Sequence, residues 1–113
     1  MTVTANQILD GIQRYVESEV IVKIPDARKW LVGAYVALMM RPFRENPSSL
    51  LNHPMIAPLG VATADGRVDI DAVHEVFLAQ AQRGPSFINI PMVGPYNIDT
   101  SDIDKIYNYI ISG

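Results

Sequence analysis

The chain contains no cysteine among its 113 residues. This absence excludes disulfide bridges, zinc sites with cysteine ligands, iron–sulfur clusters and thiol nucleophiles. It is typical of proteins that work in a reducing compartment. The first residues also lack the basic stretch followed by an apolar stretch that marks a secretory signal. We therefore expect a cytoplasmic protein rather than a secreted one.

Motifs for catalysis and cofactor binding are also missing. The sequence has no Walker loop, no nucleophile elbow and no dinucleotide-binding glycine pattern. The stretch around Asp65 resembles the middle of a calcium loop, but Val61 and Ala72 occupy positions that need oxygen ligands. His53 and His74 have no second histidine or cysteine at metal-ligand spacing. We expect a non-enzymatic protein without a cofactor or a bound metal.

The residues that are present indicate an ordered globular protein. Hydrophobic residues make up 49% of the chain and charged residues 19%, a balance far from that of disordered chains. The length predicts one domain over residues 1–113, with a helical part at 1–45. Residues 1–53 carry one excess positive charge, whereas residues 54–113 carry four excess negative charges. This opposite bias favours head-to-tail packing between copies of the chain.

The helical part is expected to be a pair of helices. Thr4 and Gln7 have the spacing of a capping box, which predicts a first helix over about 5–20. Asp26 can cap a second helix that ends near residue 40, because Pro42 should stop it. Residues 30–40 (WLVGAYVALMM) are hydrophobic on all sides and span only about 16 Å as a helix, too short for a bilayer. We therefore expect the second helix to be buried at the centre of the domain.

Gly33 and Ala37 lie four residues apart on this second helix, and small residues at that spacing let another backbone approach closely. Two alternatives remain open at this point. The backbone that approaches belongs either to the same chain or to a neighbouring molecule.

A connection rich in proline, with one expected helical turn near 48–52, leads to residues 59–113, which predict two β-hairpin–helix units. In the first unit, strands at 59–63 and 67–70 flank the Asp65–Gly66 turn, and a helix capped by Asp69 or Asp71 ends at Gly84–Pro85. In the second unit, SFINIP (86–91) and YNID (96–99) flank a turn with Gly94 and Pro95. Its helix begins at Thr100 or Ser101, with acidic residues in the first turn. The predicted fold class is α+β, with four short strands in one sheet or in two separate ribbons.

Apolar residues outside the expected buried stripes, together with the basic residues around the second helix, give a candidate protein interface. Isolated exposed apolar residues are common, and cations also solubilise helix ends. These residues therefore either form an interface or are ordinary surface residues, and both hypotheses stay open. The candidate interface residues are Leu78, Tyr109, Ile111, Arg28, Lys29, Arg41 and Arg44. They predict protein partners, in particular other copies of the chain, and no membrane contact.

The alternative function is a small regulatory or nucleic-acid-associated module that uses the basic ends of the second helix. A recognition helix needs polar side chains that reach base edges, and residues 30–40 offer none. The net charge of −3 also disfavours a broad phosphate contact. Nucleic-acid binding is therefore the weaker hypothesis.

Several motifs give the chain a resemblance to known proteins. They are IPDARKW (24–30), LGV, DG, DID and V within 59–73, GP (84–85), FINIPMVG (87–94) and DIDKIYNYI (102–110). With these motifs the chain resembles small uncharacterised proteins encoded in the structural and tail gene clusters of phages and prophages of Gram-positive bacteria. The resemblance implies a virion or assembly component, located in the bacterial cytoplasm or in the virion, and it assigns no site residues.

Overall fold

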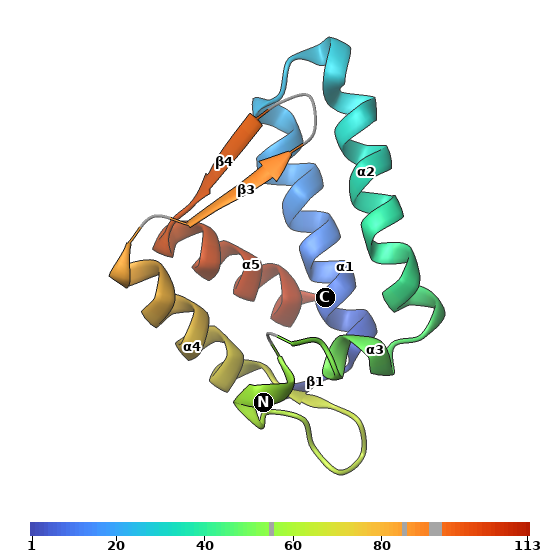
Figure 1. Cartoon of the computed structure of the whole chain (residues 1–113), viewed down its shortest axis with the longest axis vertical. Helices are drawn as coiled ribbons and strands as arrows, with labels where there is room; N and C mark the ends of the chain where they lie inside the picture. The colour runs from blue at the N-terminus through green and yellow to red at the C-terminus, as the bar shows by residue number, and fades with distance from the viewer. Residues whose placement is uncertain (55, 85, 91–93) are drawn as a thin grey trace.

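The structure is a computed structural model that describes residues 1–54, 56–84, 86–90 and 94–113. The described residues form an α+β fold of helices and short antiparallel strands (Figure 1). Pro85, expected at the junction of the two units, and Pro91, expected at the end of a strand, lie outside the described residues. The helices and strands are β1 (Thr2–Val3), α1 (Ala5–Tyr15), α2 (Asp26–Glu45), α3 (Ser48–Leu51), β2 (Val68–Asp69), α4 (Ile70–Arg83), β3 (Ser86–Ile90), β4 (Gly94–Ile98) and α5 (Thr100–Ser112).

Helix α1 begins at the predicted capping box. The Gln7 backbone N–H donates to Thr4 Oγ1 at 3.1 Å, and the Thr4 N–H donates to Gln7 Oε1 at 2.7 Å. The helix continues through a π-helical turn at Val16–Val20 and a 3-10 turn at Ile21–Lys23. The predicted span of 5–20 is therefore helical throughout, although its last turn is wider than an α-helix.

Replacing Thr4 with alanine is expected to lower the free energy of unfolding by about 1 kcal/mol, because two backbone N–H groups lose their side-chain partners or the geometry that holds them. Urea denaturation followed by circular dichroism measures the change. Ser101→Ala is the control, because Ser101 is exposed in the first turn of α5 and is not the cap residue. Equal stability of Thr4→Ala and the wild-type protein would contradict the prediction.

Helix α5 crosses α1 and packs closely against it (Figure 1). Ile110 of α5 is 4% exposed and lies directly over Gly11, whose missing side chain leaves room for the α5 backbone. A second group of buried residues, Tyr15, Val20, Ile24 and Val32, joins the end of α1 to α2. The core therefore lies on both sides of α1.

The first expected hairpin–helix unit does not form as predicted. Val68 bridges to Ala62 around the Asp65–Gly66 turn, but β2 forms its ladder with β1, at the start of the chain. Ala57–Leu59 form a 3-10 turn and Gly60 adopts φ 64°, so residues 59–63 do not form a strand. Val68 is 1% exposed. The pairing of β2 with β1 buries Val68 better than a local hairpin would, and this burial decides which strand β2 pairs with. Helix α4 follows with Asp69 as its N-cap.

The second expected unit has its strands and its helix. Strands β3 and β4 pair antiparallel in register from Ser86 with Ile98 to Ile90 with Gly94, and α5 follows. Gly94 and Pro95 lie in β4 rather than in the turn. Helix α5 begins at Thr100, one of the two predicted starts, and its N-cap Asp99 forms a capping box with Asp102. The strands of the described residues make two separate ribbons.

The prediction of a buried second helix is wrong. Helix α2 lies at the edge of the molecule, next to α1 (Figure 1). Val32 and Met40 are buried, but Trp30 is 69% exposed and Leu38 is 64% exposed. The helix also continues past Pro42 to Glu45. Pro42 is exposed, so water can reach the carbonyl group that its missing N–H leaves without an intrahelical partner.

Candidate interaction surface

One side of α2 is apolar and faces solvent. Val32, Val36 and Met40 point toward the rest of the chain and are buried or half-buried. The opposite side repeats exposed residues at helical spacing, and we call it the outer face of α2. The outer face consists of Ala27, Trp30, Ala34, Ala37, Leu38 and Arg41. Apart from Arg41, none of these side chains carries a charge, so the outer face is an apolar stripe about four turns long.

Each end of the outer face holds an exposed ion pair within α2. Asp26 stands at the N-terminal end with its side chain 96% exposed, and Lys29 Nζ lies 3.0 Å from its Oδ1. Arg41 stands at the C-terminal end with its side chain 71% exposed, and its Nε lies 3.0 Å from Glu45 Oε1. Exposed pairs of this kind contribute little to stability and exchange partners easily. The ends of the stripe are therefore available for contacts with another molecule.

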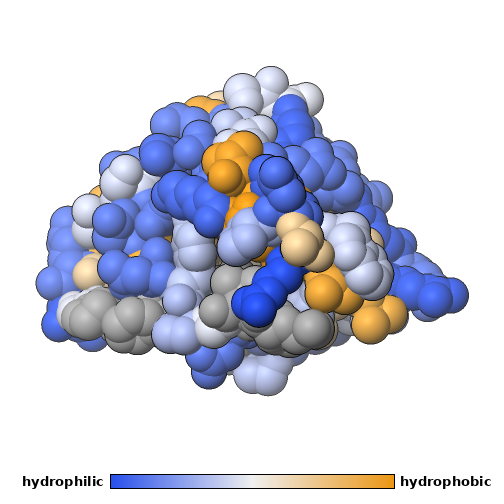
Figure 2. All heavy atoms as spheres, turned by 90° about the horizontal axis from the view of Figure 1, so that it is seen from above, coloured by the Kyte–Doolittle hydropathy of each residue, from blue (hydrophilic) through white to orange (hydrophobic). Residues whose placement is uncertain are grey.

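Apolar exposure continues beyond the outer face. Val22, which precedes α2, is 61% exposed, and Met39, on the flank of α2, is 54% exposed. Figure 2, which views the molecule from the end where α2 begins rather than onto the outer face, shows a few separate hydrophobic residues among hydrophilic ones. An apolar surface rimmed by polar groups is typical of an interaction site.

The basic residues predicted for the interface all lie on α2. Arg28, Lys29 and Arg41 reach the surface, with Lys29 partly covered. Arg44 instead joins α2 to α1, because its Nη1 lies 2.7 Å from Asp10 Oδ1 and its Nη2 donates to Gln13 Oε1 at 3.1 Å. Arg44 thus helps to fix the position of α2.

The apolar residues predicted for the interface lie elsewhere. Tyr109 is half-buried, in edge contact with the Tyr15 ring at a centroid distance of 6.5 Å, and its hydroxyl donates to Glu19 Oε1 at 3.3 Å. The expectation that Tyr109 faces away from the core is wrong, because α5 is covered by α1 as well as by α4. Ile111, 36% exposed, lines a groove of about 370 Å³ with Tyr109 and Lys105. Leu78 is half-buried on α4, far across the molecule from α2 (Figure 1).

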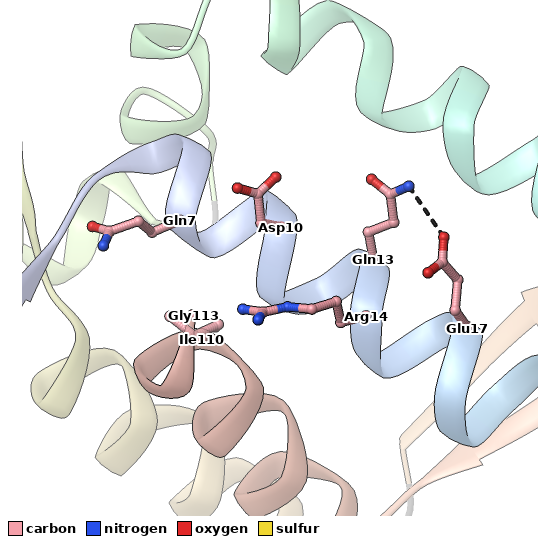
Figure 3. Close-up of a pocket in the computed structure, with 7 residues that line it drawn as sticks. All are labelled: Gln7, Asp10, Gln13, Arg14, Glu17, Ile110 and Gly113. Atoms are coloured by element: carbon pink, nitrogen blue, oxygen red, sulfur yellow. Dashed lines mark hydrogen bonds between the residues drawn. The ribbon is translucent and has the colours of Figure 1, made fainter.

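A polar pocket of about 360 Å³ lies between α1 and the last turn of α5 (Figure 3). The Arg14 side chain extends across it toward α5, where Nη2 donates to the Tyr109 carbonyl at 2.6 Å. Its Nε is buried without a protein partner. Gln13 on the rim donates to Glu17 Oε1 at 3.2 Å. Arg14 therefore acts as a cation that holds a carbonyl group near the end of α5.

Asp102 has a role that the sequence analysis missed. Asp102 is 8% exposed. Its Oδ1 accepts a hydrogen bond from the Tyr15 hydroxyl at 2.8 Å, and its Oδ2 accepts a hydrogen bond from the Asp99 N–H at 3.1 Å. Burial by itself raises the pKa of Asp102, but these hydrogen bonds and the Lys23 ammonium bring that pKa below its usual value. Burial, and then the bond to Asp102, raise the pKa of Tyr15. The spacing of Asp99 and Asp102 is a capping-box signal that could have identified this residue.

Comparison of the chain with protein-family models, curated proteins and solved structures gave no match. The candidate surface therefore depends on the geometry described above. No helix in the described ranges combines the length and the apolar character that crossing a bilayer requires.

Proposed function

We propose that the protein is a non-enzymatic structural or assembly protein that acts through protein contacts, including contacts with copies of itself. The observation that carries the proposal is the exposed outer face of α2, in which Trp30 and Leu38 are 69% and 64% exposed. Buried apolar surface is the main driving force of protein association, and tryptophan is enriched among the residues that dominate interface energies. An assembly protein is the class of protein that this surface fits best.

The setting that we propose is a phage or prophage particle, or its assembly in the bacterial cytoplasm. The resemblance of the IPDARKW, FINIPMVG and DIDKIYNYI segments to small uncharacterised proteins encoded in the structural and tail gene clusters of phages and prophages supports this setting. The alternative, a module that binds nucleic acid through the basic ends of α2, receives less support. Lys29, Arg41 and Arg44 each have a carboxylate within 3.0 Å, which lowers the positive potential that a phosphate would meet.

Light scattering coupled to size-exclusion chromatography tests the proposal. The mean mass is expected to rise above that of the monomer as the protein concentration increases from about 1 µM to several hundred µM, the range that a small interface predicts. A constant monomer mass throughout would contradict self-association. Strongly salt-dependent retention of DNA or RNA on filters would instead favour the nucleic-acid alternative.

A further inference from the structure

We propose that the outer face of α2 docks against the outer face of α2 in a second copy of the chain, with the two helices antiparallel across a twofold axis at Ala34. This inference rests on the proposed function, because it names the surface and the partner of the self-association. Three features of the outer face support it: its unused hydrophobicity, the charges at its ends and the sizes of its side chains.

Helix α2 has more apolar surface than the rest of its own chain covers. Residues 30–40 are apolar on all sides of the helix, and a helix of that kind is normally buried all round. Within one chain, only the side with Val32 and Met40 is buried, and Trp30 and Leu38 on the other side face water. A second molecule that covers the outer face gives α2 the environment that its sequence predicts.

The charges favour a second copy and define its direction. In an antiparallel pair, the Asp26–Lys29 pair of each copy lies beside the Arg41–Glu45 pair of the other. Asp26 then meets Arg41, so that two opposite-charge contacts flank the apolar stripe. A parallel pair would instead bring Asp26 close to Asp26 and Arg41 close to Arg41. The outer face is thus complementary to itself under a twofold rotation, which is the requirement for a symmetric dimer interface. This arrangement replaces the head-to-tail packing that the charge bias of the two halves of the chain suggested. The antiparallel direction also opposes the two helix dipoles favourably.

The side-chain sizes agree with this arrangement. Ala34 sits at the axis, and a small residue there allows the two helices to approach closely. Trp30 lies four residues before the axis and therefore faces Leu38 of the second copy, four residues after it. Ala37, next to Leu38, leaves space for the indole ring. Trp30 of one copy thus packs against Leu38 and Ala37 of the other, on each side of the axis at Ala34.

Trp30 reports on the proposed contact directly, because it is the single tryptophan of the chain. Its fluorescence emission is expected to move to shorter wavelength over the same concentration range in which light scattering records association. Association without any change in the emission would place the interface elsewhere, which overturns this inference and leaves the proposed function standing. A monomer mass at every concentration would overturn both.

Two neighbouring substitutions form a matched pair for a second test. Leu38→Glu is expected to raise the dimer dissociation constant at least about 30-fold, because it places a carboxylate opposite Trp30 in the apolar stripe. Met39→Glu is the control, because Met39 is similarly exposed on the same helix but lies outside the outer face. Circular dichroism verifies that both variants keep the helix content of the wild-type protein. The inference would be overturned if both substitutions raised the dimer dissociation constant equally, or if neither substitution raised it.

Charge reversal tests the contact between Asp26 and Arg41. Arg41→Glu is expected to raise the dissociation constant about tenfold, because it opposes like charges at both ends of the stripe. The double variant Asp26→Lys, Arg41→Glu is expected to recover most of the affinity, because it restores opposite charges across the interface. A double variant weaker than either single variant would overturn the antiparallel arrangement.

Cross-linking tests the direction of the two helices in a chain that has no cysteine of its own. Ala34→Cys is expected to form a disulfide-linked dimer on mild oxidation, because the two residues meet at the axis. Ala27→Cys is expected to remain unlinked, because its two copies lie roughly 20 Å apart along antiparallel helices. Efficient cross-linking of Ala27→Cys would indicate parallel helices and would overturn the proposal.

Discussion

Gly11→Ala is expected to lower the free energy of unfolding by about 2–3 kcal/mol. A Cβ atom at Gly11 would lie 2.4 Å from Ile110 Cγ1, 2.7 Å from Ile110 Cα and 2.8 Å from its backbone nitrogen. The backbone of α5 cannot rotate away as a side-chain end can, so α1 and α5 must move apart. Overpacking of this kind costs about 1–3 kcal/mol, and this contact lies between α1 and α5, the two elements that contact each other most extensively.

Gly33→Ala is the matched control for this prediction. Gly33 is also helical, but the nearest atom to an added Cβ is Ile21 Cδ1 at 4.0 Å, an ordinary contact distance. Replacing glycine by alanine within a helix usually stabilises it by about 1 kcal/mol. Urea denaturation of both variants gives the comparison. A Gly11→Ala protein as stable as the wild type would show that α5 does not approach α1 as closely as the structure indicates.

Asp102→Ala is expected to lower the free energy of unfolding by about 2–3 kcal/mol. The buried Tyr15 hydroxyl loses its carboxylate partner, and α5 loses the reciprocal hydrogen bond of its capping box. Leaving a buried polar group without its partner costs about 1–3 kcal/mol, and weakening a cap costs about 1 kcal/mol more. Asp102→Asn keeps an oxygen that can accept from Tyr15 and should be much less damaging.

The Asn variant also separates the charge of Asp102 from its hydrogen bonds. The pKa of Asp102 is lower in the folded protein than in the unfolded chain. Its ionised form therefore stabilises the protein above the unfolded pKa of about 4, and this contribution disappears as the pH falls through the folded pKa. Urea denaturation between about pH 6 and pH 2 should show a shallower loss of stability for Asp102→Asn than for the wild type. Identical slopes would contradict the lowered pKa.

Local signals in the sequence predicted several features correctly. The capping box of Thr4 and Gln7, the cap of α4 at Asp69, which was one of two candidates, and the start of α5 at Thr100 depend on neighbours three or four residues away, so the sequence pattern contains all of their partners. The α+β class followed from the same signals. The pairing of β2 could not be predicted from local signals, because its partner strand, β1, lies more than sixty residues away in the chain.

The candidate surface was predicted only in part. Arg41 was identified as an interface residue, but Trp30 and Leu38 were assigned to the core, because an apolar run gives no sign of how many of its sides the fold will cover. Gly33 and Ala37 were expected to admit a close backbone from the same chain or from a neighbouring molecule, and within one chain the structure places the close approach at Gly11 instead. Both glycines lie in helices, and only the path of α5 distinguishes them.

The sequence by itself determined the positions of the main helices, the caps of α1 and α4, the hairpin of β3 and β4, and the apolar character of the second helix on all its sides. Tertiary structure decided which residues meet: Gly11 with Ile110, Tyr15 with Asp102, and β1 with β2. It also decided that α2 lies at the edge of the fold. The physical reason is that hydrogen bonds within a helix join near neighbours, whereas burial depends on segments far apart in the chain and on how much apolar surface they can cover.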